Sequence, residues 1–422
     1  MKRLGLAMIL LGIAWTVLNE HTSERPSAPS PSRQSRTQVQ PKKATNIHDS
    51  PTPDLGASGY CGAKRPPDFR RPGISDLLNR PTKGPGNQAR GLYNRGEAID
   101  AHLDNWATSD PESPYPFIWR AHLFLQKRDA PAALLEFEKA REHLPDDPIL
   151  ALLMANILAH TPELPRAIKM LELYTQHYPA DLPKRQELAR LQTQSEIQSR
   201  YENLEFDGLT ILYPPETQHL DWLPFIHWLD DRLEEAASFT GTPKRRALTI
   251  VAFEGKAELL ATTCTPTWTG GVYDGSIKLA MKNLDTLPSK TTSAHETLHA
   301  QLSHALRRPI PAWFSEGLAQ AFAQEAPFAR RSWRQMVEHQ TYIPFPSLGD
   351  SFLEFHGSDD ARLAYHQGLA MVLWVLEEDG EDRIQEMIQM LHDPKTGHRE
   401  LIESIQINDK SEDFLRFIET ML

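Results

Sequence analysis

The sequence predicts an α+β protein with two structured parts: an α-helical repeat array over about residues 91–200 and a mixed domain over residues 205–422. Three observations lead to this fold class. Residues recur with a 34-residue period in the first part, runs rich in Ile, Leu, Val and Thr open the second, and apolar residues at helical spacing fill the rest. With 422 residues, 40% of them hydrophobic and 24% charged, the chain is long enough for two or three domains.

The composition excludes several classes of protein. Asp and Glu (56) outnumber Lys and Arg (45), for a net charge of −11, which argues against general binding to a phosphate backbone, and no nucleic-acid partner is expected. Two cysteines, Cys61 and Cys264, are too few for a disulfide-stapled scaffold or a Cys-rich zinc finger. They could form a disulfide in an oxidising compartment or stay unlinked. A metal site must therefore use carboxylates and some of the 17 histidines.

The amino terminus has the pattern of an export signal. Lys2 and Arg3 precede an apolar run over 4–18, which is shorter than the roughly 20 residues of a spanning helix. Residues 1–20 are therefore interpreted as a signal peptide or a membrane anchor, both of which stay open, with a buried amino-terminal helix as the alternative. Because Lys2 and Arg3 stay inside, we expect an exported protein, periplasmic or membrane-anchored, with its catalytic domain outside the cytoplasm.

Residues 21–90 are predicted to be a disordered linker. Pro, Ser, Thr, Gln and Arg dominate the stretch to Gly56, and Pro and Gly remain frequent to Gly91. Such a segment buries too little apolar surface to offset the entropy of ordering it. Ordered structure is expected to begin near Gly91.

Six columns of residues repeat every 34 positions over 91–200. Small residues are placed at the helix crossing, large ones lie on the same face, and a proline ends each unit. The pattern resembles the tetratricopeptide repeat, with two full units and a partial one at each end. The alternative is a helical bundle with coincidental spacing. The resemblance implies a protein or peptide partner, or a brace for the next domain. The columns are Pro111, Pro145 and Pro179; Leu103, Phe137 and Leu171; Trp106, Ala140 and Tyr174; Ala121, Ala155 and Ala189; Phe124 and Leu158; Ala133 and Ala167.

The start of the mixed domain predicts strands around one helix. The runs 209–213 and 247–253 have strand composition, and 220–237 has helical spacing between them. Asp274-Gly275 predicts a two-residue hairpin turn, and apolar residues alternate with others over 276–281. This last strand is expected to be half-exposed and able to pair with an extended peptide.

The chemical centre of the sequence is His295-Glu296-Thr297-Leu298-His299, within a helix predicted over 293–306. Residues four apart lie on one face of a helix, so the two imidazoles can bind one metal ion while Glu296 acts as general base. His304 points elsewhere and is expected at the surface.

The third ligand distinguishes the subclasses of this motif. The metzincin pattern needs Gly and His where this chain has Leu302 and Ala305. A second helix is instead predicted from Pro311, and it carries Glu316. Two histidines and one carboxylate leave the fourth position of a catalytic metal open for water.

These residues resemble a known family. His295-Glu296-x-x-His299, followed by Pro311-x-Trp-Phe-x-Glu316-Gly-Leu-Ala and preceded by a strand from Gly271, is similar to the gluzincin metallopeptidases with a peptidase MA-like domain. The similarity covers about 205–390. It implies a zincin-like fold, Zn2+ as cofactor, His295, His299 and Glu316 as ligands and Glu296 as base. Many gluzincins have an acidic residue four positions after the ligand Glu, where this chain has Gln320.

The resemblance also implies a donor for the oxyanion on a later helix. Tyr365 and His366, in a helix predicted over 361–377, are the candidates, and ordinary packing aromatics are the alternative. The tail over 378–422 has helical apolar spacing and is interpreted as packing only.

The sequence therefore predicts a zinc-dependent peptidase acting on a peptide or protein substrate, with Glu296 as general base for the attacking water. The alternative is a non-catalytic interaction protein with a metal-bearing, peptidase-like domain. Hydrolysis of a non-peptide amide, and cleavage within a chain or at its end, stay open.

Overall fold

The computed structural model describes residues 69–80, 84–127, 129–161, 163–217, 220–263, 265, 269–281, 287–306, 310–349, 352, 358–393 and 395–422. All of them belong to one compact unit, Leu55–Leu422. The fold is α+β and mostly helical, with one five-stranded mixed sheet.

Several sequence features lie outside the described residues, namely the apolar run over 4–18, Cys61 and Cys264. Among the residues that the structure does describe, no helix is both long and apolar enough to cross a membrane.

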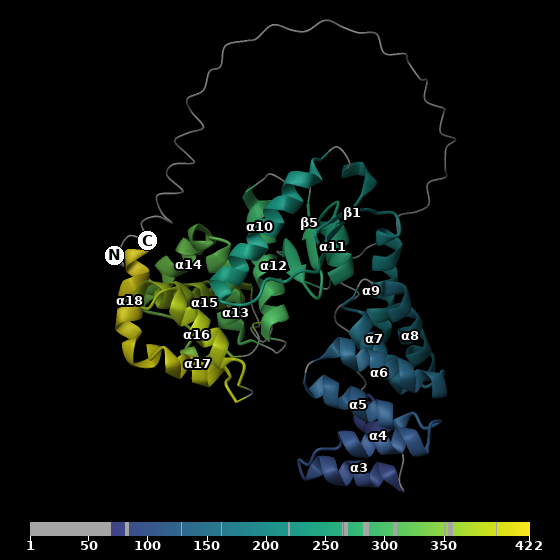
Figure 1. Cartoon of the computed structure of the whole chain (residues 1–422). Helices are drawn as coiled ribbons and strands as arrows, with labels where there is room; N and C mark the ends of the chain where they lie inside the picture. The colour runs from purple at the N-terminus through teal and green to yellow at the C-terminus, as the bar shows by residue number, and fades with distance from the viewer. Residues whose placement is uncertain are drawn as a thin grey trace, which may run out of the picture. The chain divides into compact units, whose positions relative to one another are not determined.

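Helices α3 to α9 follow one another in a stack, called here the helical array (Figure 1). Repeat columns predicted from the sequence form its core, since Leu103, Phe137 and Leu171 are all fully buried. Asp147 accepts hydrogen bonds from the first backbone N–H groups of α7, which is how an N-cap begins a helix. The helices are α3 (Pro85–Asn94), α4 (Asp100–Ser109), α5 (Tyr115–Gln126), α6 (Ala130–His143), α7 (Pro148–Leu158), α8 (Leu164–His177) and α9 (Leu182–Gln198).

Ordered structure begins earlier than the sequence suggested. The helix α2 (Ile74–Leu78) and most of α3 precede Gly91, inside the stretch predicted to be a disordered linker. Leu77 and Leu78 are buried against the helical array. Few apolar residues suffice here because a preformed helical surface covers them, which composition alone does not reveal.

The sheet has the strand order β1-β2-β3-β5-β4. Neighbours β2, β3 and β5 are parallel, while β1 and β4 pair antiparallel at the two edges. Its elements are β1 (Glu202–Phe206), β2 (Leu209–Tyr213), β3 (Leu248–Phe253), β4 (Gly271–Tyr273) and β5 (Ile277–Ala280). Both predicted strands and the helix between them, α10 (Trp222–Thr240), are confirmed.

Helices cover both faces of the sheet. On one face Ile250 and Ala252 pack with residues of α10 and with Ala300 of α12 (Leu287–Leu306). On the other face Val251 and Phe253 pack with α11 (Lys256–Thr263) and the end of α9. The long helix that carries both histidines is thereby fixed against the sheet.

The expectation of a half-exposed strand over 276–281 was wrong. Lys278 is 1% exposed, and its ammonium group donates to Asp274 and to Gln194 of α9. The strand β5 is also internal, because β4 pairs along its free side, so edge addition to 276–281 is excluded. The two-residue turn predicted at Asp274-Gly275 was also wrong, because three residues, 274–276, separate β4 from β5. Gly275 has φ +112°, and an added Cβ there would lie 2.5 Å from the carbonyl oxygen of His160.

Six helices beyond α12 form the largest apolar core. They are α13 (Ala312–Phe322), α14 (Ala326–His339), α15 (Ser358–Glu378), α16 (Glu381–Met390), α17 (His398–Ser404) and α18 (Ser411–Thr420). The packing role predicted for the tail is confirmed. Of the seven apolar residues whose helical spacing led to that prediction, Phe417 packs at the edge of the core and six are at most 1% exposed: Ile384, Met387, Ile388, Leu391, Phe414 and Ile418.

Candidate metal centre

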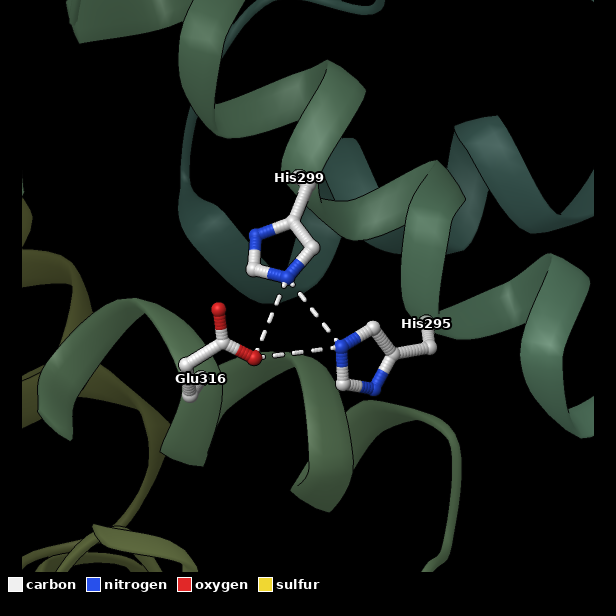
Figure 2. A group of neighbouring side chains, drawn as sticks. All are labelled: His295, His299 and Glu316. Atoms are coloured by element: carbon white, nitrogen blue, oxygen red, sulfur yellow. Dashed lines mark hydrogen bonds and ion pairs between the residues drawn. The ribbon is translucent and has the colours of Figure 1, made fainter. Parts of the chain in front are cut away.

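Three side chains from two helices converge at the centre of the domain. His295 and His299 lie one turn apart on α12, and Glu316 faces them from α13 (Figure 2). The two Nε2 atoms are 3.1 Å apart, and Oε2 of Glu316 lies 3.3 Å from the first and 3.5 Å from the second. The convergence predicted from the spacing is therefore present.

The triangle of donor atoms has the dimensions of a metal site. A tetrahedral ion with bonds of about 2.0–2.1 Å separates its ligand atoms by about 3.3 Å. The three distances bracket this value. Two imidazole nitrogens this close cannot both present lone pairs unless a proton or a cation lies between them. His295, His299 and Glu316 can thus hold a metal ion.

The ring of His295 is oriented by a carboxylate from outside the motif. Its Nδ1 lies 3.0 Å from Oε1 of Glu325, so Nδ1 carries the proton and Nε2 points at the triangle. Burial disfavours a charged ring, but the hydrogen bonds with Glu316 and Glu325 outweigh burial and raise the pKa of His295 well above its usual value.

The backbone after α13 places Glu325 at this position. Gln324 adopts the left-handed conformation, at φ +60°, and turns the chain out of the helix. The N–H of Glu325 then donates to the carbonyl of Gln320 across 2.9 Å. The reversal directs Glu325 back toward α12, nine residues after Glu316.

His299 has a neutral partner on its outer side. The hydroxyl of Ser315 lies 3.2 Å from Nδ1 of His299, leaving Nε2 directed at Glu316. Both imidazoles therefore have Nδ1 occupied and Nε2 inward, which is the arrangement metal-binding histidines need.

Glu296 is buried beside the triangle, at 7% exposure. Burial raises the pKa of its carboxyl, the charges of Glu316 and Glu325 raise it further, and the imidazoles oppose the shift. The edge strand β4 lies against this side chain at Gly271, where an added Cβ would be 3.1 Å from Cγ of Glu296. A raised pKa suits a group that must accept and return a proton.

Two glycines bring α13 and α15 into backbone contact. A Cβ on Gly317 would lie 2.4 Å from the carbonyl oxygen of Gly368, and one on Gly368 would lie 2.7 Å from that of Trp313. This close crossing brings Tyr365 to the site. Burial raises the pKa of its phenol, and the charges of Glu316 and Glu296 raise it further.

The two predicted donors differ in position. The phenol of Tyr365 is close enough to Glu316 and Glu296 for their charges to raise its pKa. His366 instead has its Nδ1 2.7 Å from the hydroxyl of Ser332 on α14. Burial lowers the pKa of His366, which favours its neutral form. His304 is exposed, as predicted.

The sequence missed the partners of the ligands. Gln320 occupies the position where an acidic residue was expected, and its amide donates to the carbonyl of Tyr365 instead. Glu325 carries out the expected role from a different position. The available signal was the acidic residue two positions before Pro327, at the start of the next helix.

No protein-family model matches the chain, and no curated protein matches its sequence. The function is therefore inferred from the geometry and chemistry of the centre.

Proposed function

We propose that the protein is a zinc-dependent peptidase of the gluzincin type. The observation that carries the proposal is the triangle formed by Nε2 of His295, Nε2 of His299 and Oε2 of Glu316, with the buried Glu296 beside it. The zincin-like fold and the tetratricopeptide-like array belong to the same proposal. They are supported by the mixed sheet under α12 and by the 34-residue period of buried residues.

The donor set suits zinc. Two imidazoles and one carboxylate form a three-ligand site with a fourth position open. Bound there, zinc would supply Lewis acidity and lower the pKa of water to about 7. The proposed ligands are held in place by Glu325 and Ser315.

The side chains around the site would carry the proton. Glu296 accepts it from the attacking water and delivers it to the amide nitrogen as the C–N bond breaks. The raised pKa of Glu296 makes it a stronger acceptor than an exposed carboxylate. Tyr365, whose pKa is also raised, keeps its phenolic proton at neutral pH and donates to the developing oxyanion.

The test combines metal analysis with cleavage of a peptide library by the full chain. We expect one zinc per chain and hydrolysis that falls about 10³-fold in Glu296→Gln, a general-base loss, with the zinc retained. The control Glu338→Gln neutralises an exposed glutamate of α14 and should leave the rate unchanged.

Two results would contradict the proposal. A wild-type chain without bound zinc removes the metal site. A zinc-loaded chain that cleaves no peptide, while binding a protein partner as well as Glu296→Gln does, supports the interaction-protein alternative.

A further inference from the structure

A short segment before the helical array lies across two of its helices. Residues 69–80, called here the leading segment, contain α2, which contacts α5 and α7. Leu77 is fully buried and Leu78 is 6% exposed. The two helices belong to consecutive units of the 34-residue repeat, so the segment bridges the units.

Two arginines attach the leading segment to equivalent positions of the array. Arg71 donates to Asp181 across 2.5 and 2.7 Å, and Arg80 pairs with Asp147. Asp147 and Asp181 are the N-cap residues of α7 and α9, 34 residues apart. Two arginines nine positions apart in the segment therefore pair with carboxylates that are one repeat apart in the array.

The carboxylate of Asp181 is paired with a cation inside the array. This side chain is fully buried, and besides Arg71 it accepts a hydrogen bond from the hydroxyl of Tyr174, across 2.8 Å. A phenol does not neutralise a carboxylate, whereas a guanidinium does so with two parallel hydrogen bonds. We define the docking face as α5 and α7 together with Asp147 and Asp181.

We propose that the docking face is a binding site for polypeptides that carry two arginines nine positions apart with a Leu-Leu pair near the second, and that the leading segment is its built-in, displaceable ligand. Two features of the leading segment support this: its two leucines are buried in the apolar core of the array, and its two arginines pair with Asp181 and Asp147. A partner with this pattern replaces the leading segment. Because the tethered segment has an effective concentration of about 1 mM, a free polypeptide binds the wild-type chain only weakly until the segment is released.

The first test uses the full chain and a labelled peptide with the sequence of residues 69–80. In fluorescence anisotropy, Arg71→Ala/Arg80→Ala should bind the peptide at least tenfold more tightly than wild type, because its own segment no longer competes. Adding Asp147→Asn/Asp181→Asn to that variant should abolish the gain. Asn is itself an N-cap residue, so the helices keep their starts.

Arg70→Ala is the matched control. Arg70 is 81% exposed and pairs within the segment, with Asp76, so its removal should leave peptide affinity at the wild-type value. A folded double-arginine variant that gains no affinity, or a wild-type chain that binds as tightly as the variant, overturns the proposal.

A second measurement uses the wild-type chain alone, should the variant unfold. An excess of unlabelled peptide, at about 1 mM, should speed deuterium exchange of the α2 amides at least tenfold by displacing the segment. Exchange in α2 that does not change with added peptide shows a permanent part of the fold and overturns the proposal.

Discussion

Asp181 in the helical array is a fully buried carboxylate, Glu316 in the metal centre is a half-buried one, and their surroundings differ. The carboxylate of Asp181 accepts two hydrogen bonds from Arg71 and one from the hydroxyl of Tyr174. Glu316 faces two imidazole nitrogens, and the second carboxylate Glu296 lies close by.

Burial opposes the charge of Asp181, but its bonds to Arg71 and Tyr174 outweigh burial and lower its pKa. Burial opposes the charge of Glu316 too, but the imidazoles of His299 and His295 lower its pKa. The pKa that differs in direction from that of Asp181 is therefore the pKa of Glu296. Burial raises the pKa of Glu296, and the imidazoles do not reverse the shift. The cluster at Asp181 contains the cation that neutralises its carboxylate, and it stabilises the fold. The cluster at Glu316 and Glu296 has more acceptor atoms than donors, and it suits the binding of an ion or a proton from solution.

The largest effect on this contrast is expected from Gly317→Ala. The new Cβ would lie 2.4 Å from the carbonyl oxygen of Gly368, so α13 and α15 must separate, at a cost of about 3 kcal/mol. Glu316 moves with α13, and metal affinity should fall by more than about 100-fold in a chelator competition, beyond the loss expected from removing a partner of one ligand. Gly349→Ala, at an open position, is the control.

The helical array should not respond to this change. Deuterium exchange of α2 in Gly317→Ala is expected to match wild type, because among the described residues α2 packs in one apolar cluster and the crossing of α13 and α15 in another. Equal loosening of both regions would show that the contrast between them is wrong.

A smaller loss of metal affinity is expected when the hydrogen-bond partner of either histidine is removed, and the two partners should differ. Glu325→Ala should lower metal affinity about 10–100-fold, because the ring of His295 loses the carboxylate that fixes its tautomer. Ser315→Ala should cost less, since a neutral hydroxyl binds His299 more weakly than a carboxylate binds His295. Titration with a metal-sensitive dye measures both, and a larger loss in Ser315→Ala would contradict this ranking.

The predictable part of this molecule is the part encoded by local spacing. His295 and His299 are four apart, so helical geometry alone places them together, and the repeat columns bury themselves for the same reason. Glu325 could not be placed, because its position depends on a left-handed Gln324 that no propensity favours. The same holds for Lys278, which hydrogen-bonds to Gln194 of α9, 84 residues earlier in the chain.

The linker boundary failed for a related reason. The stretch before Gly91 is poor in apolar residues, and composition predicts disorder for it. Arg71 and Leu77 nevertheless find partners on α5, α7 and Asp181, which are distant in sequence. A segment that is ordered by contacts with distant residues carries no sign of that order in its own composition.

The smallest effect concerns stability. Glu296 has a pKa raised above its ordinary 4.5, so the metal-free native state binds its proton more tightly than the unfolded chain does. The stability that this provides is full below about pH 4.5 and is lost as pH rises through the native pKa, so ionised Glu296 destabilises the fold near pH 7.

Glu296→Gln removes that charge. After chelation, its thermal midpoint at pH 7 should exceed that of wild type by about 2–4 °C, roughly 1 kcal/mol, and the gap should close toward pH 4.5. Glu338→Gln should show no such gap at any pH, because its side chain is exposed. A gap that widens on acidification would mean that Glu296 is stabilised in its charged form, and the metal centre would then resemble the cluster at Asp181.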